Sequence, residues 1–180
     1  MKKKILVACL CVALAVLTIA GTTLAYLTSK TDAVVNTFTV GNIDITLAET
    51  KSDFKMVPGC PIEKDPVVTV RANSEACWLF VKVEKSTNLD NFITYTIDSG
   101  WTALTGVDGV YYREVPAVTA DTSFAVLTGN QVAVKNTVTK AMMDALQVEG
   151  ATQPTLTFTA YAIQKAGFDT ATAAWAEASK

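Results

Sequence analysis

Apolar and polar residues alternate along most of the chain from Val34 onward. Apolar side chains occupy the even positions of residues 36–40 and the odd positions of residues 43–47, so the parity changes across Gly41-Asn42. Alternation with a period of two is typical of a strand that has one buried face. A β-bulge or a bend at the glycine would keep both segments facing one core.

The segment Cys77–Lys85 is the best candidate for a central strand. Its residues through Val81 are apolar on both faces, and the four residues that follow alternate. Such a strand should start buried and end with one face in water. Upstream, residues 67–70 are predicted to form a strand, which Pro66 can precede because a proline is tolerated at the start of a strand but not inside it. Residues 56–59 are predicted to form a turn.

Further short strands follow, separated by turn signals such as Asp108-Gly109 and Gly129-Asn130. The alternating segments are 93–97, 110–112, 124–126, 132–134 and 156–162. These strands, without the helical crossovers of a parallel sheet, predict an all-β fold. We expect a two-sheet antiparallel β-sandwich of jelly-roll type that spans residues 34–180.

Two short helices interrupt the strand pattern. The first covers about Thr139–Gln147, and its apolar residues, Met142 and Met143 among them, are expected to pack against the core. The second covers Ala171–Ala178, a run of good helix formers that Asp169 can cap. Neither helix carries a functional motif.

The N-terminus has the layout of a secretory signal peptide over residues 1–25. Three lysines precede sixteen largely apolar residues, Ile5–Ala20, and Thr23 and Ala25 offer small side chains at positions −3 and −1 of a cleavage site before Tyr26. A permanent anchor is the alternative, but sixteen helical residues fall short of a hydrocarbon core of roughly 30 Å. A lipoprotein box at Leu6–Cys9 lies too early in the segment.

Cleavage changes the charge and the cysteine count. Removal of 25 residues leaves 155, in which 12 basic and 17 acidic residues give a net charge of −5. Because basic residues are not clustered in this acidic remainder, a nucleic-acid partner is not expected. Cys9 and Cys11 leave with the signal, and Cys60 and Cys77 remain. Two cysteines outside the cytosol permit one disulfide, and isolated buried thiols are the alternative.

The chain contains no histidine. Its absence rules out an HExxH zinc site, a Ser-His-Asp triad and a Cys-His pair within this chain. The carboxylates are spread singly through turns and the polar faces of strands, so we assign no catalytic residue, no metal ligand and no cofactor, and expect no enzyme activity. The aromatic residues Trp78, Phe80, Tyr95, Trp101, Tyr111 and Tyr112 are expected to form core in preference to a sugar-stacking platform.

Several segments spread over most of the chain carry a shared pattern. They are residues 23–28, 36–45, 57–59, 64–66, 77–83, 160–164 and 167–169. Together they resemble the camelysin and TasA-like exported proteins of Gram-positive bacteria. The most specific part is the joint of signal and first strand, which resembles exported proteins processed by a dedicated SipW-type signal peptidase.

The resemblance implies a jelly-roll domain that is secreted to the cell surface or extracellular matrix. Its better-known relatives assemble into biofilm matrix fibres, in which the mature N-terminal segment crosses to the next subunit as a donor strand. Residues 26–40, which lack proline, are the equivalent segment here, with Val34, Val35, Phe38 and Val40 as the candidate donor residues. The implied partners are further copies of the chain, the signal peptidase, and an accessory matrix or anchoring protein.

Two further readings accompany the fibre hypothesis. Camelysin carries a metallopeptidase label, but a chain without histidine offers no catalytic position to which that activity could be transferred. The alternative from another class is a monomeric surface adhesin or ligand-binding module that recognises a carbohydrate or a host protein through loops such as Asp98–Gly109. That alternative predicts a concave, aromatic-rich site on the folded monomer.

Overall fold

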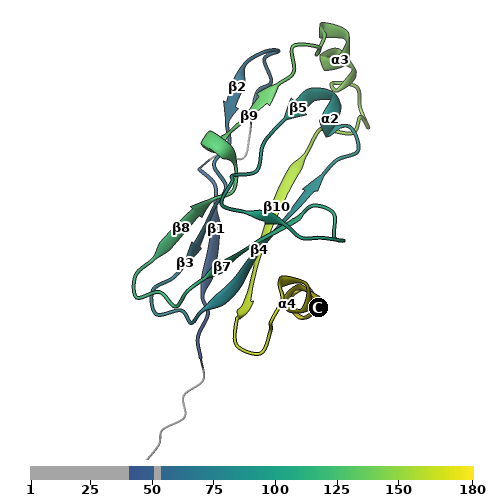
Figure 1. The fold of residues 1–180 in the computed structure, drawn as a ribbon. Coiled ribbons are helices and arrows are strands. Elements are labelled where there is room, and N and C mark those ends of the chain that lie inside the picture. Colours follow the sequence, from purple (N-terminus) through teal and green to yellow (C-terminus); the bar gives the residue numbers. More distant parts are fainter. Residues whose placement is uncertain (1–40, 51–53) are drawn as a thin grey trace, which may run out of the picture. The chain divides into compact units, whose positions relative to one another are not determined.

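Three antiparallel sheets with ten strands make up the described part of the protein, residues 41–50 and 54–180 of a computed structural model (Figure 1). The first sheet has the strand order β1 (Ile45–Ala48), β3 (Val67–Val70), β8 (Thr122–Ala125). The second has the order β10 (Leu156–Gln164), β4 (Cys77–Lys85), β7 (Val110–Val115), β6 (Thr102–Ala103). The third has the order β2 (Pro61–Glu63), β9 (Gln131–Val134), β5 (Ile93–Thr94).

The helical segments are short and lie between or after the strands. They are α2 (Leu89–Phe92), the 3-10 helix η1 (Thr128–Asn130), α3 (Lys140–Ala145) and α4 (Ala171–Ala178). None of the helices within residues 41–50 and 54–180 is long and apolar enough to cross a membrane. The prediction of antiparallel strands with few short helices is confirmed, but the expected two sheets are three.

β4 is the central strand that its sequence predicts. It pairs with β10 over nine residues and with β7 over six, and only its last residues, beginning at Glu84, are exposed. Val83 donates its backbone N–H to Gly109 O at 2.7 Å, where β7 begins. Gly109 has a φ of +72°, and a Cβ there would lie 2.6 Å from the Val83 carbonyl oxygen, so this turn requires glycine.

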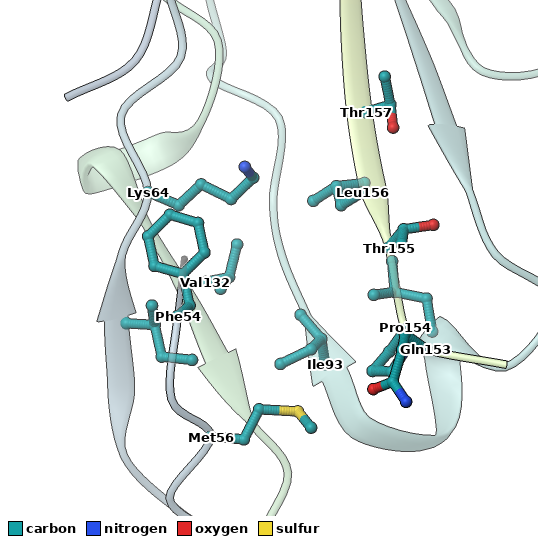
Figure 2. Close-up of a pocket in the computed structure, with 12 residues that line it drawn as sticks. Phe54, Met56, Lys64, Ile93, Val132, Gln153, Pro154, Thr155, Leu156 and Thr157 are labelled. Atoms are coloured by element: carbon teal, nitrogen blue, oxygen red, sulfur yellow. The ribbon is translucent and has the colours of Figure 1, made fainter. Parts of the chain in front are cut away.

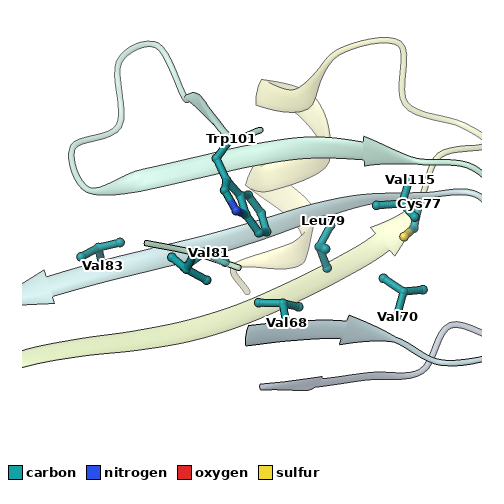
Figure 3. Packing of buried hydrophobic residues seen from close by; sticks show 9 residues of the cluster. Val68, Val70, Cys77, Leu79, Val81, Val83, Trp101 and Val115 are labelled. Atoms are coloured by element: carbon teal, nitrogen blue, oxygen red, sulfur yellow. The ribbon is translucent and has the colours of Figure 1, made fainter. Parts of the chain in front are cut away.

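The first hydrophobic core lies between the first sheet and one face of the second. Figure 3 shows Val68 and Val70 from β3 facing Leu79 and Val81 from β4, with Trp101 beside them. All four aliphatic residues have no exposed surface. Alternation on β3 and β4 produces this packing, because every second side chain points to the same face of a sheet.

The opposite face of the second sheet is covered by α4. Phe80 and Trp175 pack with ring centroids 5.3 Å apart, and Ala174, on the inner side of the helix, is fully buried. Thr170 caps the helix, because its side chain accepts a hydrogen bond from the N–H of Ala173 at 3.2 Å. The sequence-based choice of Asp169 as the cap is therefore wrong by one residue.

A second core gathers around the third sheet. It contains Leu127, Val132 and Val134, and the half-buried Met142 and Met143 of α3 pack against it, as expected. Thr139 caps α3 through a hydrogen bond from the Met142 N–H at 3.3 Å. The helix ends at Ala145, two residues earlier than expected.

Several short elements differ from the predicted pattern. The expected strand 93–97 is paired only at β5, and Ile97 makes an isolated bridge to Leu127. The strands β2 and β6 and the helix α2 were not predicted. They have two to four residues each, too few for a period to be visible in the sequence.

Candidate functional site

A pocket of about 430 Å³ lies between the third sheet and the chain that leads into β10 (Figure 2). We call it the β10 groove. One wall consists of residues 153–157, and the apolar lining on the other side comes from six residues: Phe54, Met56, Ile62, Leu89, Ile93 and Val132. Figure 2 shows the side chains of Phe54, Val132 and Ile93 in the space that faces Leu156. Eight of the twelve residues that line the groove are therefore apolar, and Lys64, Gln153, Thr155 and Thr157 add polar surface.

The wall at residues 153–157 is held by polar contacts outside the groove. Gln153 Nε2 donates to the Leu146 carbonyl oxygen at 2.6 Å, and the Thr155 N–H donates to Ser86 Oγ at 2.9 Å. The Ser86 N–H in turn donates to the Thr155 carbonyl oxygen at 3.0 Å. These bonds place the wall at a set position beside the third sheet, so the groove is formed before any partner binds.

Lys64 is the charged residue that lines the groove, and it is almost wholly buried. Its ammonium lies 2.9 and 3.1 Å from the two carboxylate oxygens of Glu49, and the exposed fractions of the two side chains are 10% and 23%. The ammonium also lies 5.0 Å from the ring centroid of Phe54 and 5.4 Å from that of Phe158. The ion pair and the two aromatic rings together compensate for the free-energy cost of removing the lysine charge from water.

One edge of β10 has no hydrogen-bonded strand beside it among the described residues, and it runs on from the groove, with β1 packed close to the strand. The Val83 N–H bonds toward β7, so odd-numbered residues of β4 direct their backbone groups to β7 and even-numbered ones to β10. Their partners in β10 are odd-numbered, from Thr157 to Ile163. The N–H and C=O groups of Leu156, Phe158 and Ala160 therefore point away from β4. Among the described residues, the second sheet ends at this strand.

Two sets of predicted residues lie outside the described residues. They are the cleavage-site residues Thr23, Ala25 and Tyr26, and the candidate donor residues Val34, Val35, Phe38 and Val40. Both sets remain predictions.

The two cysteines among the described residues, Cys60 and Cys77, do not form the disulfide that their number permits. Both thiols are free; Cys60 is exposed, and Cys77 has no exposed surface. Cys60 lies in the turn before β2, where its carbonyl oxygen accepts the Val134 N–H at 3.0 Å, whereas Cys77 begins β4 in the core between the first and second sheets. Burial raises the pKa of the Cys77 thiol to about 11, so it is an unreactive packing group.

Carboxylates in the described ranges do not converge. No group of three or more His, Cys, Asp or Glu residues there could hold a metal ion. Asp121, for example, accepts hydrogen bonds from Arg71 Nη1 and the Ala72 N–H, at 2.9 and 2.8 Å, and so holds two strands together. The loop Asp98–Gly109 is folded onto the second sheet through β6, with Trp101 and Leu104 buried.

Sequence reasoning missed Phe54 and Lys64 as parts of a site. A signal for Lys64 was present, because Ile62, Lys64 and Pro66 share one parity and would face the same side of a strand. A lysine on an apolar face requires a partner, and Glu49 supplies it from a segment that the alternation does not connect to β2. Comparison of the chain with protein-family models, with curated proteins and with solved structures finds no match.

Proposed function

We propose that this protein is an exported structural subunit that assembles into fibres by lending residues 26–40 to the next copy as a strand. The observation that carries the proposal is the β10 groove, which is preformed, has one mainly apolar wall and adjoins a strand edge with outward-pointing backbone groups. An added strand would pair with that edge and place every second side chain in the groove.

The N-terminal segment has the pattern that such a groove requires. Val34, Phe38 and Val40 share one parity, so a strand would present them on a single face, while Thr37 and Thr39 would point to the other. A contact in which one copy gives and the next receives is head-to-tail, and it propagates because it does not close. The assembled unit would be a structural protein and would carry no enzyme activity.

The resemblance to camelysin and TasA-like proteins supports the same function. It implies a jelly-roll type of sandwich, export by a cleaved signal peptide, and a place in the extracellular matrix or at the cell surface. Cleavage between Ala25 and Tyr26 by a dedicated signal peptidase would then free the donor segment. Retention at the cell would come from the fibre or from an accessory anchoring protein.

Electron microscopy of the purified chain that starts at Tyr26 tests the proposal directly. We expect fibres from this chain and none from a chain that lacks residues 26–35. A peptide of residues 26–40, added in excess, should stop fibre growth because it occupies the groove of the terminal subunit. Fibres formed equally well by the shortened chain would refute donor-strand assembly.

Neighbouring residues of the donor segment supply a matched control, because they point to opposite faces of a strand. Phe38→Asp would place a charge against the apolar wall of the groove and should abolish fibres. Thr39→Asp adds the same charge to the neighbouring residue, on the other face of the strand, and should leave assembly largely intact. Equal loss of fibres in both variants would show that charge, and not the face of the strand, limits assembly.

A further inference from the structure

A second pocket, of about 630 Å³, lies among α2, β5, β6 and β7. Three aromatic residues line it, Tyr95, Trp101 and Tyr111, and charged side chains surround them. We call it the aromatic pocket. Its volume lies within the range of roughly 300–1,000 Å³ that is usual for small-molecule sites. It is formed by the folded domain alone and does not depend on the proposed fibre.

The aromatic residues are held rigidly by the fold. Trp101 donates its indole N–H to the Ala125 carbonyl oxygen at 2.8 Å, and its side chain packs in the first core. Tyr111 lies in β7, paired with Ala103 on one side and Val81 on the other. Tyr95 is half-buried, and loss of solvent raises the pKa of its hydroxyl. These side chains would lose little conformational freedom on binding a ligand.

Charged groups gather at one part of the lining. Lys85 Nζ lies 2.5 Å from Asp90 Oδ2, and Lys135 Nζ donates to the Asp90 backbone carbonyl oxygen. Asp98 supplies a further carboxylate, whose Oδ1 accepts the Gly100 N–H at 2.9 Å. The lining therefore offers strong donors and strong acceptors beside aromatic surface.

We infer that the aromatic pocket binds a saccharide. A sugar ring has apolar C–H faces and a rim of hydroxyl groups, each of which is both donor and acceptor. The half-buried rings of Tyr95 and Tyr111 match the faces, beside the buried Trp101, and carboxylate and ammonium groups match the rim. Asp90 pairs with Lys85, and Asp98 accepts the Gly100 N–H, but each carboxylate keeps further acceptor capacity that a sugar hydroxyl would use and a purely apolar ligand would not.

A peptide strand fits this place less well. Strand addition needs a run of free backbone groups on a sheet edge. The strands nearest the pocket, β5 and β6, have only two residues each, Ile93–Thr94 and Thr102–Ala103. The lining also contains four charged residues, whereas the lining of the β10 groove contains one, Lys64. Two different surfaces of the domain thus suit two different classes of partner.

Titration of the ¹⁵N-labelled chain from Tyr26 onward, kept monomeric by Phe38→Asp, with oligosaccharides tests the inference. The probes are the tetrasaccharides cellotetraose, chitotetraose and tetragalacturonate, which differ in their substituents and charge. The chain has three tryptophans, and Trp78 and Trp175 pack in the cluster beneath α4, away from the pocket lining. We expect at least one probe to shift the Trp101 indole signal in a saturable manner and to leave the other two indole signals in place.

Two substitutions in the lining should weaken that binding. Tyr111→Leu keeps an apolar side chain but removes the ring, and Asp90→Asn removes the charge of an exposed helical residue; each should raise the Kd by about tenfold or more. Tyr112→Leu is the matched control, because Tyr112 is the neighbouring residue of β7 and contacts Trp78, with ring centroids 5.8 Å apart. Its Kd should change less than about twofold.

Three results would overturn the inference. The first is that none of the three probes shifts the Trp101 indole signal at millimolar concentration. The second is that Tyr112→Leu weakens saccharide binding as much as Tyr111→Leu does. The third is that the peptide of residues 26–40 shifts the Trp101 signal and the saccharides do not. If Tyr111→Leu does not fold, Asp90→Asn decides the outcome, because Asp90 is exposed on the surface of α2.

Discussion

The partly buried ion pair between Lys64 and Glu49 gives the sharpest test of how the β10 groove is built. Lys64→Met keeps most of the apolar stem and removes the charge, which leaves the Glu49 carboxylate 23% exposed without its cation. Glu49→Leu leaves an ammonium that is only 10% exposed. Breaking a fully buried pair costs about 3–5 kcal/mol. Since Glu49 keeps some solvent, we expect losses in unfolding free energy of about 1–3 kcal/mol for Lys64→Met and about 2–4 kcal/mol for Glu49→Leu.

The double variant separates the pair from its surroundings. With both charges gone, neither group is left buried without a partner, so the double variant should lie within about 1 kcal/mol of the parent. Urea unfolding of the chain from Tyr26 onward, kept monomeric by Phe38→Asp and followed by tryptophan fluorescence, measures the stability of the parent, the two single variants and the double variant. Losses below about 0.5 kcal/mol in both single variants would mean that the pair behaves like an exposed salt bridge, and the account of a buried charge would be wrong.

Three further predictions concern the backbone at Gly109, the thiol of Cys77 and the N-terminal cap of α4. Gly109→Ala should lower the free energy of unfolding by roughly 2–4 kcal/mol and Gly106→Ala by roughly 1–2 kcal/mol, measured by urea unfolding. Both glycines have a positive φ, but only at Gly109 would the new Cβ lie 2.6 Å from a backbone oxygen. Equal losses would contradict this close contact. Burial raises the pKa of Cys77 from 9.0 to about 11, so its contribution to stability is complete below pH 9 and is lost as the pH rises through 11. The difference in stability between the parent and Cys77→Val should therefore shift by about 2–3 kcal/mol across that window, and a constant difference would show that the thiol is not desolvated. Thr170→Ala should lower the free energy of unfolding by about 1 kcal/mol in thermal unfolding, and Asp169→Ala should lower it by less, because Thr170 caps α4. A larger loss for Asp169→Ala would show that Asp169 is the cap.

Features that depend on neighbouring residues in the chain could be predicted from the sequence. The alternation in β3 and the continuous apolar run at the start of β4 predict which faces are buried, because side chains on a strand alternate whatever the strand pairs with. Pro66 and Gly109 predict where strands begin and turn, since each restricts or permits backbone angles at its own position. These local rules gave the antiparallel, mostly β character of the fold and the position of its central strand.

Features that depend on which strands meet were decided only by the tertiary structure. The third sheet forms because β9 pairs with β2 and β5, which lie about 70 and 40 residues earlier in the chain, and no local period contains that choice. The same pairing brings Phe54 and Lys64 opposite the start of β10 and so creates the groove. It also leaves Cys60 in the turn before β2, whereas Cys77 is buried at the start of β4. Alternation specifies that a face is buried, whereas the partner that buries it is set by the packing of the whole chain.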